Sequence, residues 1–286
     1  MPELPFVEVL SENLRSRIGG RTVGDVLVRG VSALKTFDPP VASLAGHRIV
    51  GVRRRGKLLV FDLTPGLAMV MHLRRNGRLQ VLPRATGRTA RDLAIAYALD
   101  DGYDLRLIEI GPKKAASVWI FHAGDEDRHE PIAGLGVEPL SDGLTASGLG
   151  EMLRAERTHV KRFLTLQRYI AGIGNAYSDE ILWEARLSPM TLTAALTEDE
   201  IVRLHGAIRT VLDAAVTSHR LEFAGTLPMR EPLHLLRVHR HGGEPCPRCG
   251  TPIAVIYYGE RETYYCPTCQ TKGVVYADRR RSRLLK

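Results

Sequence analysis

The sequence predicts an α+β multidomain protein with an N-terminal β-sandwich, a helical region after it and a small cysteine-bounded hairpin near the end. Three observations predict this class. Short apolar runs broken by Gly, Pro and Asp-Gly fill residues 22–122, helical periodicity returns over 151–220, and all four cysteines fall within 246–269. The 286 residues are enough for about two domains at the usual ~100–200 residues each.

The composition is that of a globular protein. Hydrophobic residues make up 44% of the chain and charged residues 25%, which argues against extensive disorder. No window approaches the ~18 consecutive apolar residues that a transmembrane helix needs. The start, Met1-Pro2-Glu3-Leu4-Pro5, lacks the basic and apolar segments of a secretory signal. We therefore expect a cytoplasmic protein with no membrane partner.

The net charge of +8 suggests a polyanionic partner, and it is distributed unevenly. Residues 271–286 hold six cations and one anion, and Arg53-Arg54-Arg55-Gly56-Lys57 forms a second cluster. Solubilising tails and loops show the same pattern, so the charge by itself leaves both interpretations open.

The first 130 residues are predicted to form the β-sandwich and its flanking helix. Phe6, Val7, Leu10, Leu14 and Ile18 recur at helical spacing, which predicts one amphipathic helix over 1–18. Six or seven short strands with turn residues between them then indicate a sandwich. The predicted strands are Val23–Val28, Arg48–Arg53, Leu58–Leu63, Leu67–Leu73, Leu93–Leu99, Leu105–Ile110 and Ala116–Phe121.

The rest of the chain is predicted to comprise a linker, a helical domain and a terminal unit. Gly, Asp and Pro are frequent over 131–150, which we interpret as the linker. We place the helical domain at 151–235 and the cysteine-bounded unit with its basic tail at 236–286. Helices are expected over Lys161–Arg168, after Asn175 and over Thr197–Ser218.

The four cysteines predict a zinc site. Their spacing is C-x2-C-x16-C-x2-C, formed by Cys246, Cys249, Cys266 and Cys269. Each C-x2-C turn aims two thiolates at one point, as a tetrahedral Zn²⁺ site requires. Four protein thiolates close the coordination sphere, so the ion would be structural and would stabilise a unit too small for its own core. A redox pair or free thiols are the alternatives.

Two turns are predicted to present groups suited to phosphate. Between the cysteine pairs, Ile253–Tyr258 and Thr263–Tyr265 predict a β-hairpin with Arg261 at its tip. Upstream, the glycine-rich segment 171–174 predicts a turn between two helices, the second capped by Asn175. Backbone N–H groups at such a turn favour anions, although an ordinary corner between helices has the same pattern.

The N-terminus carries a candidate nucleophile. If Met1 is removed, Pro2 presents a secondary amine, and an α-amino group has a pKa near ~7.7–8 against ~10.4 for lysine. A neutral amine can attack a sugar aldehyde carbon and form an iminium, with Glu3 moving protons. The alternative is that these residues are simply the exposed start of a chain.

In their order along the chain, these features resemble the formamidopyrimidine-DNA glycosylase / endonuclease VIII family of base-excision repair enzymes. The resemblance spans nearly the whole sequence. It implies an N-terminal β-sandwich and a C-terminal helix–two-turn–helix domain with a zinc ribbon, which hold DNA in a cleft between them. The matching segments are Pro2-Glu3-Leu4-Pro5, Lys57 after a glycine, Met71-His72-Leu73, Gly172–Glu180 and the cysteine ribbon with Arg261.

The resemblance also implies roles for individual residues. Pro2 matches the nucleophile that attacks C1′ of the damaged nucleotide, and Glu3 matches the general acid/base. Lys57 matches a lysine that binds the phosphate beside the lesion. We count Lys57 and Arg261, together with Pro2 and Glu3, among the expected catalytic residues. The implied DNA contacts are His72, Arg75, Lys161, Asn175 and Arg261.

The implied function is a bifunctional DNA glycosylase and abasic-site lyase that acts through a Schiff base on Pro2, followed by β,δ-elimination. Its partner would be double-stranded DNA with a damaged base or an abasic site. We expect a monomer in a bacterial-type cytoplasm, associated with the nucleoid, with one structural Zn²⁺ as cofactor. The alternative is a non-catalytic homologue that binds damaged DNA while Pro2 is inert.

Four departures from the family pattern predict a lesion preference other than 8-oxoguanine. Phe6 replaces a glutamate, and it either lines the lesion pocket or packs into the core with Leu10. Arg75 replaces the methionine that fills the vacated space in the duplex. The family's Asp-Pro-Arg-Arg-Phe-Gly loop is absent, and Glu109–Ala115 occupies its region. Leu166 stands where an aspartate is common.

Overall fold

The protein is described here by a computed structural model that covers residues 1–258 and 261–276. It divides into two compact units, of which the first comprises Met1–Gly134 with His219–Glu231 and the second comprises Leu135–Ser218 with the residues from Pro232 onward. No helix within the described ranges combines the length and the apolar character that crossing a membrane requires.

The first unit begins with helix α1, Leu4–Ile18, which confirms the helix predicted at the N-terminus. Pro5 is tolerated in the first turn because the N–H that it lacks would have no partner inside the helix. Leu10, Leu14 and Ile18 lie on one face and are fully buried in the core of the unit. Arg15 and Arg17 lie in the last turn, where a positive charge is favourable.

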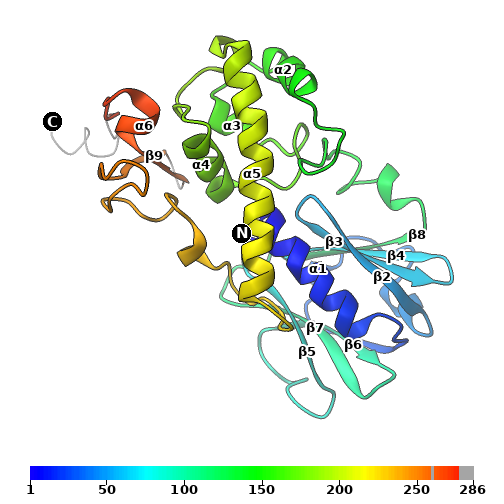
Figure 1. The fold of residues 1–286 in the computed structure, drawn as a ribbon. Coiled ribbons are helices and arrows are strands. Elements are labelled where there is room, and N and C mark those ends of the chain that lie inside the picture. The colour runs from blue at the N-terminus through cyan, green and yellow to red at the C-terminus, as the bar shows by residue number, and fades with distance from the viewer. Residues whose placement is uncertain (259–260, 277–286) are drawn as a thin grey trace. The chain divides into compact units, whose positions relative to one another are not determined.

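Two four-stranded antiparallel sheets follow, one strand more than the longest set that the sequence predicted (Figure 1). Buried side chains from both sheets and from α1 form one hydrophobic core, so this part of the unit is a β-sandwich with a flanking helix. The first sheet has the order β1 (Val23–Val28), β6 (Leu93–Leu99), β7 (Tyr103–Glu109) and β5 (Gly77–Pro83). The second has the order β2 (Arg48–Arg55), β3 (Leu58–Thr64), β4 (Leu67–His72) and β8 (Ser117–His122).

Strand β5 was not predicted from the sequence. It pairs with β7 from Gly77 opposite Glu109 to Pro83 opposite Tyr103, at the edge of its sheet. An edge position tolerates the proline that made the segment resemble a turn. Gly77 is required for another reason, because a Cβ atom there would lie 2.5 Å from the carbonyl oxygen of Leu73.

The second unit is mainly helical. Helix α2 begins inside the interval interpreted as a linker, because the Thr145 side chain caps it by accepting the N–H of Gly148 at 3.0 Å. The α-helices are α2 (Ala146–Ala155), α3 (Val160–Leu164), α4 (Asn175–Glu184), α5 (Glu198–Glu222) and α6 (Pro267–Thr271). The last four residues of α5 belong to the first unit.

The terminal hairpin is formed by β9 (Ala254–Tyr258) and β10 (Arg261–Tyr265). It shares a small core with α4 through Trp183, Val238 and Tyr264. Short 3-10 turns complete the described elements at Val31–Ala33, Val41–Leu44, Glu126–Arg128, Thr193–Ala195 and Leu233–Leu235.

Candidate functional site

The structure brings Pro2, Glu3 and Lys57 together at the start of the first unit. Glu3 precedes the first turn of α1 and is only 5% exposed, and Pro2 is also buried. Lys57 is 7% exposed and follows Gly56, whose φ of +58° allows the tight turn between β2 and β3. Burial lowers the pKa of Lys57, while the negative charges of Glu3 and Glu231 act to raise it.

Glu231 belongs to this cluster and was missed by the sequence analysis. Its Oε1 accepts the backbone N–H of Glu3 at 2.8 Å, and its Oε2 lies 3.7 Å from Nε2 of His219. Burial raises the pKa of Glu231, opposed by the contact with His219. Glu231 lies in an irregular segment without periodicity or motif, so no sequence signal could have found it.

These charges shift the pKa of the terminal amine. As the chain stands, the amine belongs to Met1, and burial lowers its pKa. The carboxylates of Glu231 and Glu3 act to raise that pKa, whereas Lys57 and Arg75 act to lower it. The start of the chain is therefore surrounded by two acids and two bases, which is the kind of setting that suits proton transfer.

His72 ends β4, and Arg75 lies in the turn that joins β4 to β5. Nδ1 of His72 accepts the backbone N–H of Arg74 at 2.9 Å, so Nε2 carries the proton of a neutral ring. Burial, with the charges of Arg74 and Lys57, lowers the pKa of His72 to about 3. His72 can therefore offer a ligand an uncharged donor, while Arg75 is exposed on the loop that follows.

The loop after β7 is held by its own hydrogen bonds. Oε1 of Glu109 accepts the N–H groups of Ala115 and Ala116 at 2.6 and 2.8 Å. Asn76 donates through Nδ2 to the carbonyl of Lys113 at 2.8 Å, which ties this loop to the Arg75 loop. The loop also lines a hollow of about 570 Å³ whose wall includes Glu109, Lys114 and Arg91.

Phe6 lies in the core, so its assignment to the lesion pocket is corrected. It is 1% exposed, and its ring meets that of Phe223 edge to face at 6.2 Å between centroids. The reason is its position on the buried face of α1, which Leu10 and Leu14 share. This placement matches the alternative in which Phe6 packs with Leu10.

Lys161 is committed to contacts inside the second unit. Its Nζ lies 2.6 Å from Oδ1 of Asp179 and donates to the Glu262 carbonyl at 3.0 Å and to Oγ1 of Thr263 at 2.8 Å. These contacts engage all three N–H donors of the ammonium group. Lys161 therefore fastens strand β10 to helices α3 and α4, and its expected contact with DNA stays a prediction.

Asn175 lies at the same junction. It is the first residue of α4 rather than its cap, since Gly174 occupies the capping position. The Asn175 amide donates to the Glu262 carbonyl at 2.9 Å. Asn175 thus lies next to β10, whose first residue is Arg261. The side chain of Arg261, the hairpin tip at 259–260 and the basic tail from Arg279 to Lys286 lie outside the described residues.

The glycine-rich turn before α4 is closed by Gln167. Its Oε1 accepts the N–H of Gly172 at 2.9 Å, and its Nε2 donates to the carbonyl of Ile173 at 2.7 Å. Gly172 has φ +94°, a conformation that an L side chain rarely adopts. Because Gln167 takes part in the turn, α3 ends at Leu164, earlier than the predicted Arg168.

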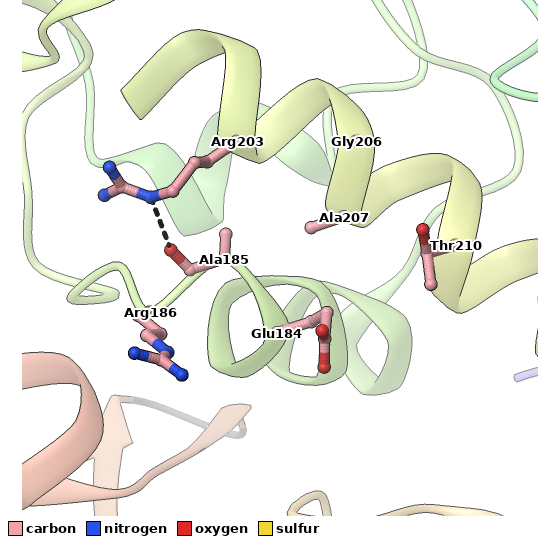
Figure 2. A pocket seen from close by; sticks show the side chains of 7 residues that line it. All are labelled: Glu184, Ala185, Arg186, Arg203, Gly206, Ala207 and Thr210. Atoms are coloured by element: carbon pink, nitrogen blue, oxygen red, sulfur yellow. Dashed lines mark hydrogen bonds between the residues drawn. The ribbon is translucent and has the colours of Figure 1, made fainter. Parts of the chain in front are cut away.

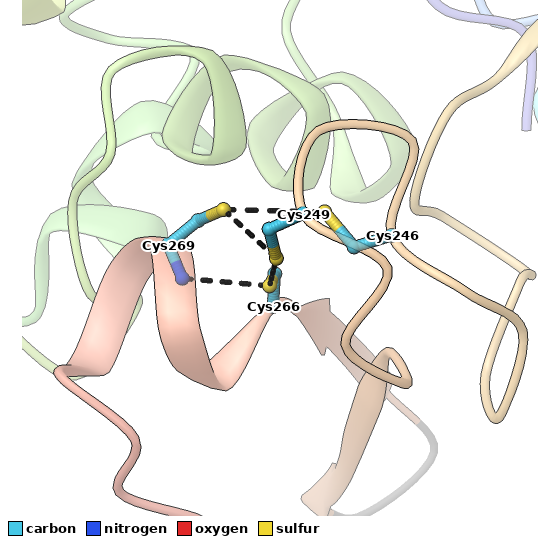
Figure 3. Close-up of side chains that lie close together, drawn as sticks. All are labelled: Cys246, Cys249, Cys266 and Cys269. Atoms are coloured by element: carbon cyan, nitrogen blue, oxygen red, sulfur yellow. Dashed lines mark hydrogen bonds between the residues drawn. The ribbon is translucent and has the colours of Figure 1, made fainter.

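The four cysteines converge as the spacing predicted (Figure 3). All four Sγ atoms lie within 4.8 Å of one another, with Cys246–Cys269 at 4.0 Å and Cys249–Cys266 at 3.4 Å. A tetrahedral site with Zn–S bonds of about 2.3 Å needs sulfurs about 3.8 Å apart, so the cluster fits zinc. Trp183 donates its indole N–H to Cys246 Sγ at 3.3 Å, which links the site to α4. The protein therefore has one structural zinc site.

A separate hollow of about 450 Å³ lies between α4 and α5 in the second unit (Figure 2). At one edge of the hollow, Nε of Arg203 on α5 donates to the carbonyl of Ala185 at 3.4 Å. Its lining contains none of the predicted site residues: it consists of Glu184, Ala185, Arg186, Arg203, Gly206, Ala207 and Thr210.

Three domain families match the chain in the predicted order. Residues 1–111 match the formamidopyrimidine-DNA glycosylase N-terminal domain and residues 135–223 match the formamidopyrimidine-DNA glycosylase H2TH domain. Residues 243–272 match the zinc finger found in FPG and IleRS. The matches extend over both units and the cysteine ribbon.

Whole-chain relatives agree with these matches. The formamidopyrimidine-DNA glycosylase of Symbiobacterium thermophilum is 37% identical, over 98% of this chain and 93% of that protein. The structure of Lactococcus lactis FPG with DNA containing FAPY-dG has a TM-score of 0.85 and 27% identity, covering 94% of this chain and 100% of the other. The Lactococcus lactis complex with abasic-site DNA has a TM-score of 0.83 and 26% identity, covering 94% and 99%.

Proposed function

The chain belongs to the formamidopyrimidine-DNA glycosylase family, and we propose that it forms a Schiff base with its substrate through the Pro2 nitrogen. It is a DNA glycosylase of base-excision repair with abasic-site lyase activity, and DNA is its partner. The observation that carries the proposal is the burial of Glu3 and Lys57 beside the start of the chain.

Removal of Met1 is the first requirement, because it converts the Pro2 nitrogen from an amide into an amine. The lone pair of this amine attacks C1′ of the damaged nucleotide, and the bond from C1′ to the base breaks. The nitrogen then releases its proton, the bond from C1′ to the ring oxygen O4′ breaks and O4′ takes up a proton, which leaves an iminium between the nitrogen and C1′. Glu3 delivers the proton that the departing base needs and later accepts one from the sugar. The nucleotide must first leave the stack, at a cost of a few kcal/mol.

The lyase reaction then follows from the iminium. Its positive nitrogen withdraws electrons and acidifies the proton on C2′. Loss of that proton expels the 3′ phosphate by β-elimination, and a second elimination expels the 5′ phosphate. The iminium nitrogen accepts the electrons at each stage.

DNA contacts from both units offset the cost of turning out the nucleotide. In the first unit we assign Lys57 and the neutral Nε2–H of His72 to phosphates and Arg75 to the duplex beside the lesion. In the second unit we assign Asn175 and Arg261 to the same backbone. We propose that the protein acts as a monomer in a bacterial-type cytoplasm, on DNA of the nucleoid.

We also propose that the lesion preference differs from 8-oxoguanine. Three features support this. Phe6 stands where the family has a glutamate, so a hydrogen-bond acceptor is lost there, and the ring lies in the core. The exposed Arg75 lies on the loop expected to fill the vacated space in the duplex. Glu109 holds a short loop after β7 by hydrogen bonds. A guanidinium can fill the space by stacking its plane on a base, and it adds attraction to phosphate.

Borohydride trapping on a panel of duplexes tests both proposals. The panel carries 8-oxoguanine, a formamidopyrimidine, an oxidised pyrimidine or an abasic site, each opposite the four bases. We expect a reducible cross-link with the abasic duplex and with at least one lesion other than 8-oxoguanine. Efficient 8-oxoguanine release with a preference for opposite cytosine would contradict the altered preference. Binding without any cross-link would support the non-catalytic alternative.

A further inference from the structure

The segment 219–231 lies along helix α1 and is fastened to it at several points. Asn13 donates through Nδ2 to the carbonyls of Phe223 and Thr226, at 3.0 and 2.5 Å. Glu12 and Arg220 form an ion pair at 2.7 Å. We call residues 219–231 the strap, and both the strap and α1 belong to the first unit.

The strap brings its last residue, Glu231, to the N-terminal end of α1. There Oε1 of Glu231 accepts the backbone N–H of Glu3 at 2.8 Å. The N-terminal end of a helix carries a partial positive charge from its free N–H groups, so this position favours a carboxylate. The hydrogen bond fixes the peptide that joins Pro2 to Glu3.

A cluster of aromatic rings packs the strap against α1 beside this carboxylate. The ring of Phe6 meets that of Phe223, and the ring of Phe223 meets that of His219 at 5.9 Å between centroids. His219 is 1% exposed and faces Oε2 of Glu231 at 3.7 Å. Packing on one side and the N–H of Glu3 on the other leave Glu231 little freedom to move.

We propose that Glu231 is a positioning residue for the nucleophile, holding the Pro2–Glu3 peptide in place and supplying negative charge beside the terminal amine. The inference rests on the proposed function of Pro2 and extends it to a residue outside the N-terminal motif. A misplacement of about 1 Å costs on the order of 100-fold in rate, so a fixed peptide matters for a nucleophile at a chain end.

The charges around the amine give the proposal its readout. In the chain as it stands, Glu231 precedes Glu3 among the carboxylates that raise the pKa of the Met1 amine, one residue from Pro2, while burial, Lys57 and Arg75 lower it. His219 and Glu3 are the charged or titratable groups that face Glu231 itself. Glu231 also acts to raise the pKa of Arg78, whereas the charge of Arg230 acts to lower it. Removing the charge of Glu231 therefore leaves the amine with a lower pKa and more of it neutral at a given acidic pH.

Two variants separate the charge from the hydrogen bond. Glu231→Gln keeps an acceptor for the N–H of Glu3 but removes the charge, and Glu231→Ala removes both. The rate of borohydride trapping on abasic-site DNA is measured across pH for each variant. Glu151→Gln, an exposed change on α2, is the matched control. The mass of each N-terminus and the thermal unfolding of each protein are recorded alongside.

We expect the acidic limb of the trapping profile to move to lower pH in Glu231→Gln, with little loss of rate on the plateau. Glu231→Ala should lose about 10- to 100-fold of the plateau rate. A Glu231→Gln profile that superimposes on the wild type would overturn the proposal, and this variant decides the matter if Glu231→Ala does not fold. Trapping by the wild type and its loss in Pro2→Gly establish the proposed function separately, so the two failures are distinguishable.

Discussion

Two clusters of buried charged residues, one in each unit, differ in how fully their charges are paired. In the second unit the ammonium of Lys161 lies 2.6 Å from Asp179, whose other oxygen lies 2.8 Å from Nδ1 of His239. Next to it, Glu180 accepts the backbone N–H groups of residues 237, 238 and 239. Each of these charges faces groups that satisfy its charged form.

In the N-terminal cluster of the first unit, burial dominates. It lowers the pKa of Lys57 and raises that of Glu231, so burial disfavours the charged form of each group, while Glu3 opposes the shift of Lys57 and His219 opposes that of Glu231. Burial also raises the pKa of Glu180, but three N–H donors oppose that shift. The difference lies in the two lysines: Lys161 has three partners and holds the hairpin in position, whereas burial lowers the pKa of Lys57, a setting that suits the proton transfer proposed above.

The largest effect should come from Pro2→Gly. Loss of the proline amine should reduce borohydride trapping at least about 1,000-fold, because a nucleophile has no substitute in the reaction that it initiates. DNA binding, measured by fluorescence anisotropy with the abasic duplex, should change little. Equal trapping by the variant would point to another amine, with the buried Lys57 as the first suspect.

Replacing Cys266 should abolish the zinc site. Cys266 is fully buried and caps α6, and structural zinc contributes about 10–16 kcal/mol of apparent binding free energy in small finger domains. We expect Cys266→Ser to lose zinc by metal analysis and to bind DNA weakly. The control is Thr268→Ala, an exposed change in the same turn. Retained zinc stoichiometry in Cys266→Ser would contradict the four-cysteine site.

Lys161→Ala should destabilise the second cluster. It leaves the Asp179 carboxylate buried without its ammonium partner, a change that costs about 3–5 kcal/mol in comparable buried pairs. Urea unfolding measures the loss, with the exposed neighbour Arg162→Ala as control. Unchanged stability together with weakened DNA binding would instead support the predicted contact of Lys161 with DNA.

Arg261→Ala should have the smallest effect. A phosphate contact carries no base information, so binding should weaken equally on all sequences. The slope of log affinity against log salt should fall by about 0.9. Anisotropy titrations at several salt concentrations measure this slope. An unchanged slope would remove Arg261 from the phosphate contacts.

Periodicity and spacing were sufficient to predict the sandwich, α1 and the cysteine cluster, because each depends on local pattern. Strand β5 was missed, since Gly77 and Pro83 resemble turn residues until the edge position is known. Lys161 was assigned to DNA from the family resemblance, and its contacts with Asp179 and Thr263 could not be predicted because no local signal connects these residues. Glu231 was also missed, because its partner Glu3 lies 228 residues away and no local pattern connects the two.

The most direct test of the account is to locate the cross-link. The processed protein is trapped with borohydride on abasic-site DNA, digested and examined by peptide mass spectrometry. The account predicts that Met1 is absent and that the sugar remnant is attached to the nitrogen of Pro2. A remnant on Lys57, or a trapped protein that still carries Met1, would contradict it.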